Sequence, residues 1–410
     1  MPLTAPRLPF HIVGAGPAGL AAALTVARAG ERAIVYEQRP DVGGRFHGDL
    51  QGIENWTTRG DVLEELDALG ISPRFDARPF REGIFFDPAG REYRYASSDP
   101  LFYIVRRGAT AGTLDSSLKQ QAFEAGVEIR FREPCARLPD GGIVAGGPRA
   151  ADAIAVGYVF ETDRADGAFA ALSERLAPKG YAYLLVCGGR GTVASCLFED
   201  FHNEREYLER AVEFFRQRAG LSMRNPVRFG GVANILVPKT ARQGSILFVG
   251  EAAGFQDALW GFGIRIGMLS GHLAARALLD RRPESYDRAW RARLGGLLRT
   301  SIVNRYAFAR MGDSGYAKLM RGIARCRDGR RWLAGHYAPC WSKTMLLPIA
   351  RRVVRSRRTA PGCPDPECVC TWCRVRHAPA REASCLLRPR DPRWDSRLDA
   401  RSPLSLRNPG

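Results

Sequence analysis

The sequence has no long uninterrupted apolar segment. None of its 410 residues belongs to a run approaching the roughly 18 apolar residues that a membrane-spanning helix requires. The N-terminus leads almost at once into an apolar strand, without the basic segment and cleavage site of a secretory signal. These absences argue against an integral membrane protein and predict a cytoplasmic location.

Lysine is scarce, and acidic residues are scarce in the last third of the chain. Only 5 of the 61 basic residues are lysine, which is typical of a protein from a GC-rich genome. Residues 1–270 carry 31 basic and 32 acidic residues, a net charge of −1, whereas residues 271–410 carry 30 and 11, a net charge of +19. No motif for nucleic-acid recognition accompanies this excess. The candidate partner is therefore an anionic membrane surface and not nucleic acid.

A glycine-rich turn near the N-terminus has the context of a dinucleotide-binding unit. An apolar strand at 10–13 leads into Gly-Ala-Gly-Pro-Ala-Gly, a helix of small residues follows, and a strand at 32–36 leads to an acid. In such a unit the first glycine makes the tight turn, the second admits a pyrophosphate and the third allows close packing. The helix N-terminus attracts the phosphates, and the acid accepts from the adenosine ribose. The predicted cofactor-binding residues are Gly14, Gly16, Pro17, Ala18, Gly19 and Glu37.

Two further glycine-rich segments favour FAD over a nicotinamide cofactor. Val42-Gly43-Gly44-Arg45 resembles the second glycine pair of two-dinucleotide-binding-domain flavoproteins, which lets the chain bend close under FAD. One glycine turn cannot hold so long a cofactor, and residues 246–263 read as a buried strand, a second turn and the start of a helix. Gly267, Gly271 and Ala275 then form a stripe for close helix packing. The predicted contacts here are Gly44, Arg45, Gly250, Glu251, Ala252, Gly261, Phe262 and Gly263.

The second turn carries a family resemblance. Residues 250–254, Gly-Glu-Ala-Ala-Gly, resemble the Gly-Asp-Ala-Ala-Gly turn of the geranylgeranyl reductase-like branch of the FAD-dependent oxidoreductases that includes p-hydroxybenzoate hydroxylase. Residues 178–185 match the spacing of the reductases' Pro-x-x-Tyr-x-Trp-x-Phe motif, with two of the four positions changed. The Asp-Gly motif that the hydroxylases use with nicotinamide cofactors has no counterpart at 141–158. The resemblance covers about residues 8–320 and favours a reductase over a hydroxylase.

The resemblance also implies which residues lie near the flavin and the substrate, and each of them has an alternative explanation without a functional role. The family has an arginine before a helix near the flavin, for which Arg106 is the candidate with Arg107 beside it; a solvated arginine pair is the alternative. Tyr181 and Tyr183 would line an elongated apolar pocket, or be ordinary hairpin residues. His47 stands near the place of a cysteine that the reductases carry close to the flavin. It would exchange a proton during hydride transfer, or be a loop histidine bonded to backbone.

The basic last third combines predicted helices with a cysteine cluster. Residues 283–355 read as Arg-rich helices, which either lie against the flavin domain or, at 340–358, form an interfacial membrane segment. Five of the ten cysteines lie within 363–385, and four of them have the spacing C-x4-C-x-C-x2-C. So dense a cluster predicts a zinc or iron–sulfur site, with a redox dithiol or a tail without function as alternatives. The predicted ligands are Cys363, Cys368, Cys370 and Cys373.

The sequence thus predicts an α/β fold with a Rossmann-like FAD-binding domain, an inserted mixed or antiparallel substrate-side sheet and a helical C-terminal region. The predicted divisions are 8–150 with 236–282 for FAD, 151–235 for the sheet, 283–355 for the basic helices and 356–410 for a partly disordered tail. The predicted activity is reduction of C=C bonds in an isoprenoid or other lipid-like apolar substrate by hydride from reduced FAD, with NAD(P)H as candidate electron donor. A monooxygenase or dehydrogenase acting on an aromatic or polyketide-like compound, and a non-catalytic lipid-chain carrier, are the alternatives.

Overall fold

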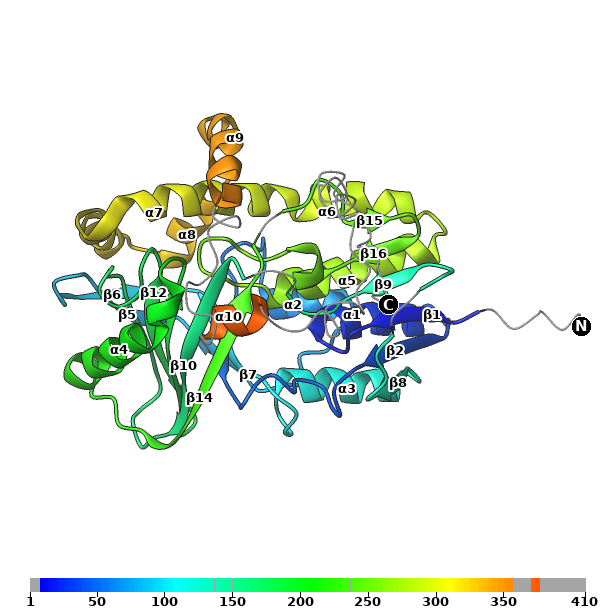
Figure 1. Ribbon diagram of the computed structural model, residues 1–410, viewed down its shortest axis with the longest axis horizontal. Helices are drawn as coiled ribbons and strands as arrows, with labels where there is room; N and C mark the ends of the chain where they lie inside the picture. Colours follow the sequence, from blue (N-terminus) through cyan, green and yellow to red (C-terminus); the bar gives the residue numbers. More distant parts are fainter. Residues whose placement is uncertain (1–7, 136–137, 149–150, 236, 357–369, 377–410) are drawn as a thin grey trace, which may run out of the picture.

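The protein has two lobes that lie side by side along its long axis. The computed structural model describes residues 8–135, 138–148, 151–235, 237–356 and 370–376. One lobe contains the N-terminal strands, the other contains the strands of residues 153–233, and a long helix of residues 295–324 runs along both (Figure 1). The α/β fold with a Rossmann-like unit and a second sheet is confirmed.

The first lobe is built on a six-stranded sheet with the order β15-β16-β9-β1-β2-β8. Its neighbouring pairs are parallel except β15 with β16. A row of paired residues across the four central strands, Val35, Ile12, Ile143 and Leu247, is fully buried, as in parallel strands that are covered on both faces. The strands are β1 (Phe10–Val13), β2 (Ala33–Glu37), β8 (Glu128–Phe131), β9 (Gly142–Val144), β15 (Arg242–Gln243) and β16 (Ile246–Phe248).

Helices α1 (Pro17–Arg28) and α5 (Ile264–Leu279) pack directly on each other beside this sheet. A Cβ atom at Gly271 would lie 2.0 Å from the carbonyl oxygen of Ala18, and one at Gly267 would lie 3.6 Å from the Ala18 Cβ. Only glycine permits the first of these approaches, so the predicted small-residue stripe is confirmed as a packing surface. Helix α3 (Leu114–Glu124) lies on the other side of α1 (Figure 1).

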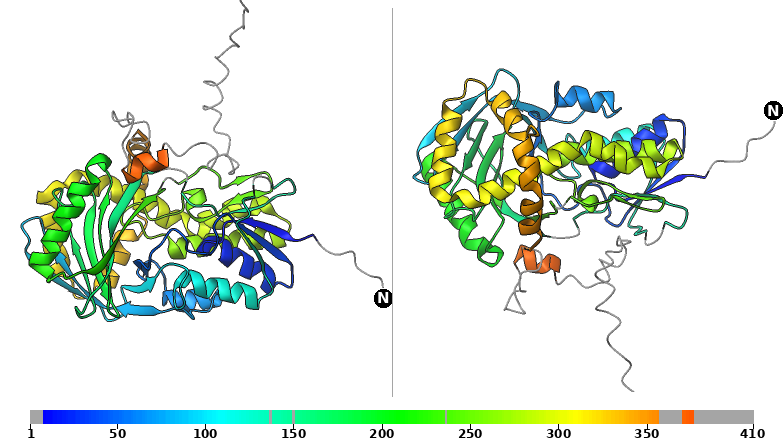
Figure 2. Two further views of the ribbon diagram at one scale, coloured as in Figure 1. Left: turned by 60° about the horizontal axis from the view of Figure 1, so that its bottom comes forward. Right: turned by 90° about the horizontal axis from the view of Figure 1, so that it is seen from above.

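The second lobe is built on a seven-stranded sheet with the order β14-β10-β13-β12-β11-β5-β6. Its pairs are antiparallel except β11 with β5, which confirms the predicted mixed or antiparallel sheet. Helix α4 (Glu204–Ala219) covers one face, as Figure 2 shows. The strands are β5 (Glu82–Phe86), β6 (Glu92–Ala96), β10 (Ala153–Glu161), β11 (Gly167–Ala171), β12 (Tyr181–Cys187), β13 (Arg190–Leu197) and β14 (Arg224–Ala233).

The sheets do not follow the boundary predicted at residue 150. Strands β5 and β6 belong to the segment that was predicted to bind FAD, yet they extend the substrate-side sheet, with Phe169 of β11 opposite Ile84 of β5. The pairing joins segments far apart in sequence, so no local pattern indicates it. A three-stranded sheet, β3 (Leu50–Glu54), β7 (Phe102–Arg106) and β4 (Ala77–Phe80), completes the strands, and α2 (Val62–Ala68) follows β3.

The described residues of the C-terminal third are largely helical, as predicted. The helices are α6 (Tyr286–Arg293), α7 (Gly295–Ala324), α8 (Gly329–Tyr337), α9 (Trp341–Ser356) and α10 (Thr371–Arg376), and the short 3-10 helices of the chain are η1 (Phe201–Asn203), η2 (Gly250–Ala253) and η3 (Pro283–Ser285). Helix α7 is kinked at Gly312, whose φ of +57° interrupts the helical backbone. Within the described ranges, no helix is both long and apolar enough to cross a membrane.

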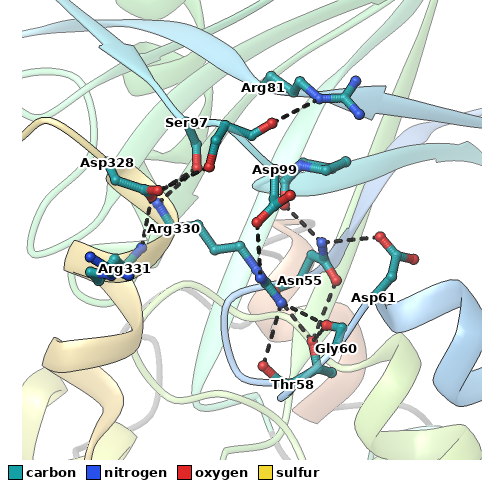
Figure 3. A network of polar contacts seen from close by, with 12 residues as sticks. Asn55, Thr58, Gly60, Asp61, Arg81, Ser97, Asp99, Asp328, Arg330 and Arg331 are labelled. Carbon is teal, nitrogen blue, oxygen red and sulfur yellow. Dashed lines mark hydrogen bonds and ion pairs between the residues drawn. The ribbon is translucent and has the colours of Figure 1, made fainter.

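A polar network fastens α8 to the rest of the molecule (Figure 3). Asp328 caps α8 by accepting from the Arg331 N–H at 3.0 Å, and it also accepts from the Ser97 hydroxyl at 2.9 Å. Arg330 donates to the carbonyl oxygens of Asn55 at 2.7 Å and Gly60 at 2.6 Å. These contacts fix the rotation of α8, and with it the side chains that α8 directs at the interior.

Candidate functional site

A cavity of about 680 Å³ extends from the first lobe into the second. Backbone of the two glycine turns forms one end, and aromatic and aliphatic side chains form the other. Strand β12 contributes every second side chain to the cavity wall, because successive side chains of a strand point to opposite faces of the sheet. Tyr181, Tyr183 and Leu185 face the cavity, whereas Ala182 and Leu184 pack towards α4.

The first glycine turn has the geometry that a dinucleotide requires. Gly14 has a φ of +99°, and a Cβ there would lie 2.7 Å from the Ala145 carbonyl oxygen. A Cβ at Gly19 would lie 1.9 Å from the Gly14 carbonyl oxygen. Gly16 is different, because no atom lies within 4 Å of a Cβ built on it, and it lies on the cavity wall. The first and third glycines thus serve the fold, and the second keeps space free beside the N-terminus of α1.

Glu37 is held at the end of β2 and also lies on the cavity wall. Its two carboxylate oxygens accept from the backbone N–H groups of Ala15 and Arg39, both at 2.9 Å. The carboxylate is therefore fixed to the first glycine turn itself. This is the position that the sequence predicts for the acid that accepts from the adenosine ribose.

The second glycine pair brings distant segments together. Gly43 has a φ of +62°, and a Cβ there would meet the Gly108 backbone at 2.7 Å. Gly44 and Arg45 lie on the cavity wall, and the Arg45 guanidinium is 2.8 Å from the Glu251 carboxylate of the second turn. Both partners of this ion pair are predicted cofactor contacts, and both are partly exposed.

Arg107, and not Arg106, lies on the cavity wall. Arg106 turns away and donates to the Ala111 carbonyl oxygen at 2.6 Å. Arg107 is buried, makes two bonds of 2.8 Å to the Asp115 carboxylate and stacks on the Phe46 ring at 4.0 Å. Burial works to raise the pKa of Asp115, but the Arg107 guanidinium and its hydrogen bonds bring that pKa below its usual value. Of the two arginines that the resemblance indicated, Arg107 lines the cavity and Arg106 does not, and a contact of Arg107 with the flavin stays a prediction.

The second glycine turn and the loop between it and α5 line the cavity with glycine-rich backbone. Gly250 has a φ of +54° and donates to the Ser270 hydroxyl at 2.9 Å. Gly261, Phe262 and Gly263 line the cavity just before α5, as do Gly250 and Glu251. Ala252 is buried and does not line it.

A buried carboxyl that the sequence analysis missed holds this loop. Asp257 accepts from the Trp260 N–H at 2.8 Å and from the Tyr337 hydroxyl at 2.9 Å. Its own carbonyl oxygen accepts from the Gly261 N–H at 3.0 Å. Burial raises the pKa of Asp257 to about 6. Asp257 is a positioning residue, because it acts through the loop and does not touch the cavity.

The apolar end of the cavity is assembled from the seven-stranded sheet and from the C-terminal helices. The Tyr181 hydroxyl donates to the Trp260 carbonyl oxygen, and the two rings meet edge to face at 5.3 Å. Burial raises the pKa of Tyr181 and of Tyr183 well above the usual value, so both stay protonated. The aromatic and aliphatic side chains of this end include Phe85, Phe169, Phe198, Leu319, Met320, Ile323, Trp332 and Leu333. The last five come from α7 and α8, which the sequence analysis did not connect with the pocket.

His47 does not face the cavity. Its side chain is exposed, and its backbone N–H donates to the Asp49 carboxylate at 2.8 Å. Asp49 lies on the cavity wall with only 3% of its surface exposed, and burial raises the pKa of its carboxyl. Asp49 is therefore a buried acid on the cavity wall, whereas His47 is not on that wall.

The predicted metal ligands are described only in part. Cys363 and Cys368 lie outside the described residues. Cys370 and Cys373 are buried and lie close together at the start of α10, and His202 joins them, with the ligand atoms of the three within 4.8 Å of one another. His202 was not among the predicted ligands, since it is 168 positions from Cys370 in sequence.

Comparison with known proteins finds a Rossmann-like family model and reductases of similar sequence. Residues 12–52 match a family model described as an NAD(P)-binding Rossmann-like domain. The chain is 21% identical to the digeranylgeranylglycerophospholipid reductase of Methanocaldococcus jannaschii, covering 78% of this chain and 91% of the relative. It is 24% identical to digeranylgeranylglycerophospholipid reductase 2 of Methanothermobacter thermautotrophicus, covering 76% and 90%.

A solved structure shares the fold over nearly its whole length. The geranylgeranyl bacteriochlorophyll reductase-like protein of Thermoplasma acidophilum matches with a TM-score of 0.65 at 17% identity, covering 85% of this chain and 98% of that chain. In fold and in sequence the chain is similar to FAD-dependent oxidoreductases. Within that class it is similar to the geranylgeranyl reductases, which confirms the resemblance predicted from the sequence.

Proposed function

We propose that the protein reduces C=C bonds of an isoprenoid or other lipid-like apolar chain with electrons from FAD. The observation that carries the proposal is a continuous cavity whose one end is glycine-turn backbone and whose other end is aromatic and aliphatic. The names of the relatives, which are reductases of digeranylgeranyl lipids, support the same substrate class. NAD(P)H stays the candidate electron donor.

The chain offers a complete set of groups for FAD. The first glycine turn and the N-terminus of α1 would hold the pyrophosphate, with Glu37 at the adenosine ribose. Arg45, Arg107 and Glu251 would hold the middle of the cofactor, and the backbone of residues 261–263 would face the flavin ring. Bound and reduced, the flavin would supply a hydride, and the N-terminus of α5 would stabilise negative charge on the ring.

The remaining wall residues would orient the substrate. Tyr181 and Trp260 fix each other through their hydrogen bond, which leaves an apolar ring surface towards the cavity. Residues of α7 and α8 close the far end and exclude water. A double bond that accepts a hydride also needs a proton, and the carboxyl of Asp49 is a buried group on this wall that can supply it.

A membrane surface is the proposed partner, and α9 is the proposed contact. Trp341, Met345 and Ile349 are 80%, 70% and 51% exposed and recur every four residues, so they form one apolar stripe. The opposite side of α9 packs on the core through Ala350. The helix projects from the body (Figure 1), and its basic C-terminal part includes the exposed Arg352. This arrangement suits the interface of an anionic bilayer, where a lipid substrate would be met.

The test is an anaerobic reduction of the purified protein with dithionite, followed by mixing with digeranylgeranylglycerophospholipid dispersed in detergent. We expect re-oxidation of the flavin that this lipid accelerates, a product that has gained two hydrogens, and no acceleration by the saturated lipid. A transient oxygen adduct on mixing with air, with an oxygenated product, would make the protein a monooxygenase. Purified protein without flavin, into which FAD cannot be loaded, would favour the carrier.

Two variants identify the proton donor in the same assay. Asp49→Asn is expected to slow re-oxidation by the lipid at least tenfold while flavin content is kept, because an amide cannot replace the acid. His47→Asn is the matched control and is expected to change the rate by less than twofold. The opposite ranking would return the role to His47.

A further inference from the structure

The side chains of His202, Cys370 and Cys373 form a cluster outside the cavity. His202 belongs to η1, between β13 and α4, and the two cysteines flank the first turn of α10 in a Cys-x-x-Cys arrangement. The His202 Nδ1 atom is 3.6 Å from the Cys370 Sγ atom and 3.8 Å from the Cys373 Sγ atom. Both thiols are buried, at 8% and 0% exposure.

These spacings are those of ligands around one tetrahedral ion. A nitrogen at about 2.05 Å and a sulfur at about 2.3 Å from a tetrahedral zinc are separated by about 3.6 Å. The observed nitrogen–sulfur distances of 3.6 and 3.8 Å agree with this value. Two thiolates also balance the two charges of the ion, so the set can be buried without a further counter-charge.

Surrounding contacts hold the ligands in place. The Cys373 N–H donates to the Cys370 Sγ at 3.4 Å, which orients that sulfur. The Trp372 ring packs edge to face on the His202 ring at 5.4 Å. Between the cysteines, the Thr371 N–H and hydroxyl donate to the buried Glu204 carboxylate at 2.8 and 3.1 Å. Such contacts around ligands orient them and are part of a metal site.

The chemistry of the donors selects the ion. Thiolate and imidazole ligands suit zinc, whereas calcium and magnesium require oxygen ligands. Iron–sulfur clusters are held by four cysteines, or by two cysteines with two histidines, and the described residues supply one histidine and two thiols. Three ligands leave one tetrahedral position for water or a further ligand.

We propose that His202, Cys370 and Cys373 bind one Zn²⁺ ion, which fastens α10 to η1 and to the edge strand β14. Helix α10 contacts β10, β14 and η1, and a Cβ at Gly230 of β14 would lie 2.5 Å from the Thr371 hydroxyl. Gly230 and its neighbours also line the cavity. The ion therefore supports the cavity wall from behind and takes no part in the redox chemistry.

The test measures metal content by inductively coupled plasma mass spectrometry after growth with zinc and desalting. We expect one zinc per chain in the wild type and at least a fivefold loss in His202→Ala and in Cys373→Ser. Cys187→Ser, which removes a thiol elsewhere in the same sheet, is the matched control and keeps the zinc. His202→Cys restores a ligand and is expected to keep the zinc, which separates loss of a ligand from loss of the fold.

A second readout uses the intact wild-type protein. Removal of the ion with a chelator and addition of Co²⁺ should give thiolate-to-cobalt charge-transfer bands, which Cys373→Ser should lack. Three outcomes overturn the proposal. The first is iron with acid-labile sulfide in the wild type. The second is a metal-free wild type in which a reductant makes two further thiols titratable, which would reveal a disulfide. The third is a zinc content that is unchanged in both His202→Ala and Cys373→Ser.

Discussion

The Arg45 guanidinium and the Glu251 carboxylate, 206 positions apart in the sequence, form an ion pair of 2.8 Å between the second glycine pair and the second glycine turn. Both side chains lie on the cavity wall. The pair therefore sets the distance between two segments that are expected to hold the same cofactor.

Glu251→Gln should weaken FAD binding more than it weakens the fold. The pair is partly exposed, so its loss should change the free energy of unfolding by less than about 1 kcal/mol. The flavin dissociation constant should rise about tenfold, a loss of about 1.4 kcal/mol. Urea unfolding and flavin titration measure the two effects. Glu92→Gln removes an exposed ion pair away from the cavity and should leave flavin binding unchanged.

Gly16→Val should remove flavin without unfolding the protein. A Cβ at Gly16 meets no protein atom within 4 Å, and the backbone there is extended, so the valine fits the protein but occupies the space of the pyrophosphate. We expect at least a tenfold loss of bound FAD and a far-ultraviolet circular dichroism spectrum like that of the wild type. Gly322→Ala, at a glycine with equally open surroundings in α7, is the control. Full flavin content in Gly16→Val would contradict the assignment of this turn.

Arg107 and Arg106 should differ sharply in their effect on stability. Arg107→Ala leaves the buried Asp115 carboxylate without its partner, which should lower the free energy of unfolding by about 3–5 kcal/mol. Arg106→Ala removes a more exposed side chain with a longer ion pair of 3.7 Å and should cost less than about 1 kcal/mol. Urea denaturation distinguishes them, and equal effects would mean that the Asp115 pair contributes little.

Asp257 should make stability fall as pH rises through the acid range. Its pKa of about 6 in the folded protein lies above the ordinary 3.8, so the folded state binds the proton more tightly than the unfolded state. Its stabilising contribution is complete below about pH 4 and is lost as pH rises through 6, a change of about 3 kcal/mol. The free energy of unfolding of Asp257→Asn should lack this descent. Parallel profiles for the two proteins would show that Asp257 does not titrate in this way.

The apolar stripe of α9 should govern binding to anionic membranes. Serine at Trp341, Met345 and Ile349 together should weaken sedimentation with phosphatidylglycerol vesicles at least tenfold, because the buried apolar area is lost. Val227→Ser with Met311→Ser removes exposed apolar side chains elsewhere and should not change binding. Wild-type protein that ignores these vesicles, or a triple variant that binds equally well, would exclude α9 as the contact.

Local sequence predicted the parts of the site that local geometry determines. The first glycine turn, Glu37 and the glycines before α5 each belong to a short local pattern of strand, turn and helix, so the expected and the observed elements agree. Arg106 and Arg107 differ by one position, and the orientation of each depends on partners such as Asp115 that pattern alone does not supply.

The parts that the sequence did not predict depend on contacts between distant segments. Asp49 reaches the cavity wall because β3 pairs with β7, and His202 meets the cysteines because α10 lies on β14. The residues of α7 and α8 at the apolar end of the cavity have the spacing of the apolar face of any amphipathic helix. They line the cavity only because of where the two helices lie in the folded protein, and their spacing in the sequence does not indicate this contact.

Helix α7 has a consequence for how such an enzyme can change. Its 30 residues begin beside the cofactor lobe and end at the far wall, where Leu319, Met320 and Ile323 close the cavity that the sheet lines along its sides. The depth of the cavity and the redox chemistry at its other end therefore depend on different segments of the chain. Under the proposed function, substitutions at these three positions should change the length of hydrocarbon chain that the cavity accepts and leave the redox end unchanged.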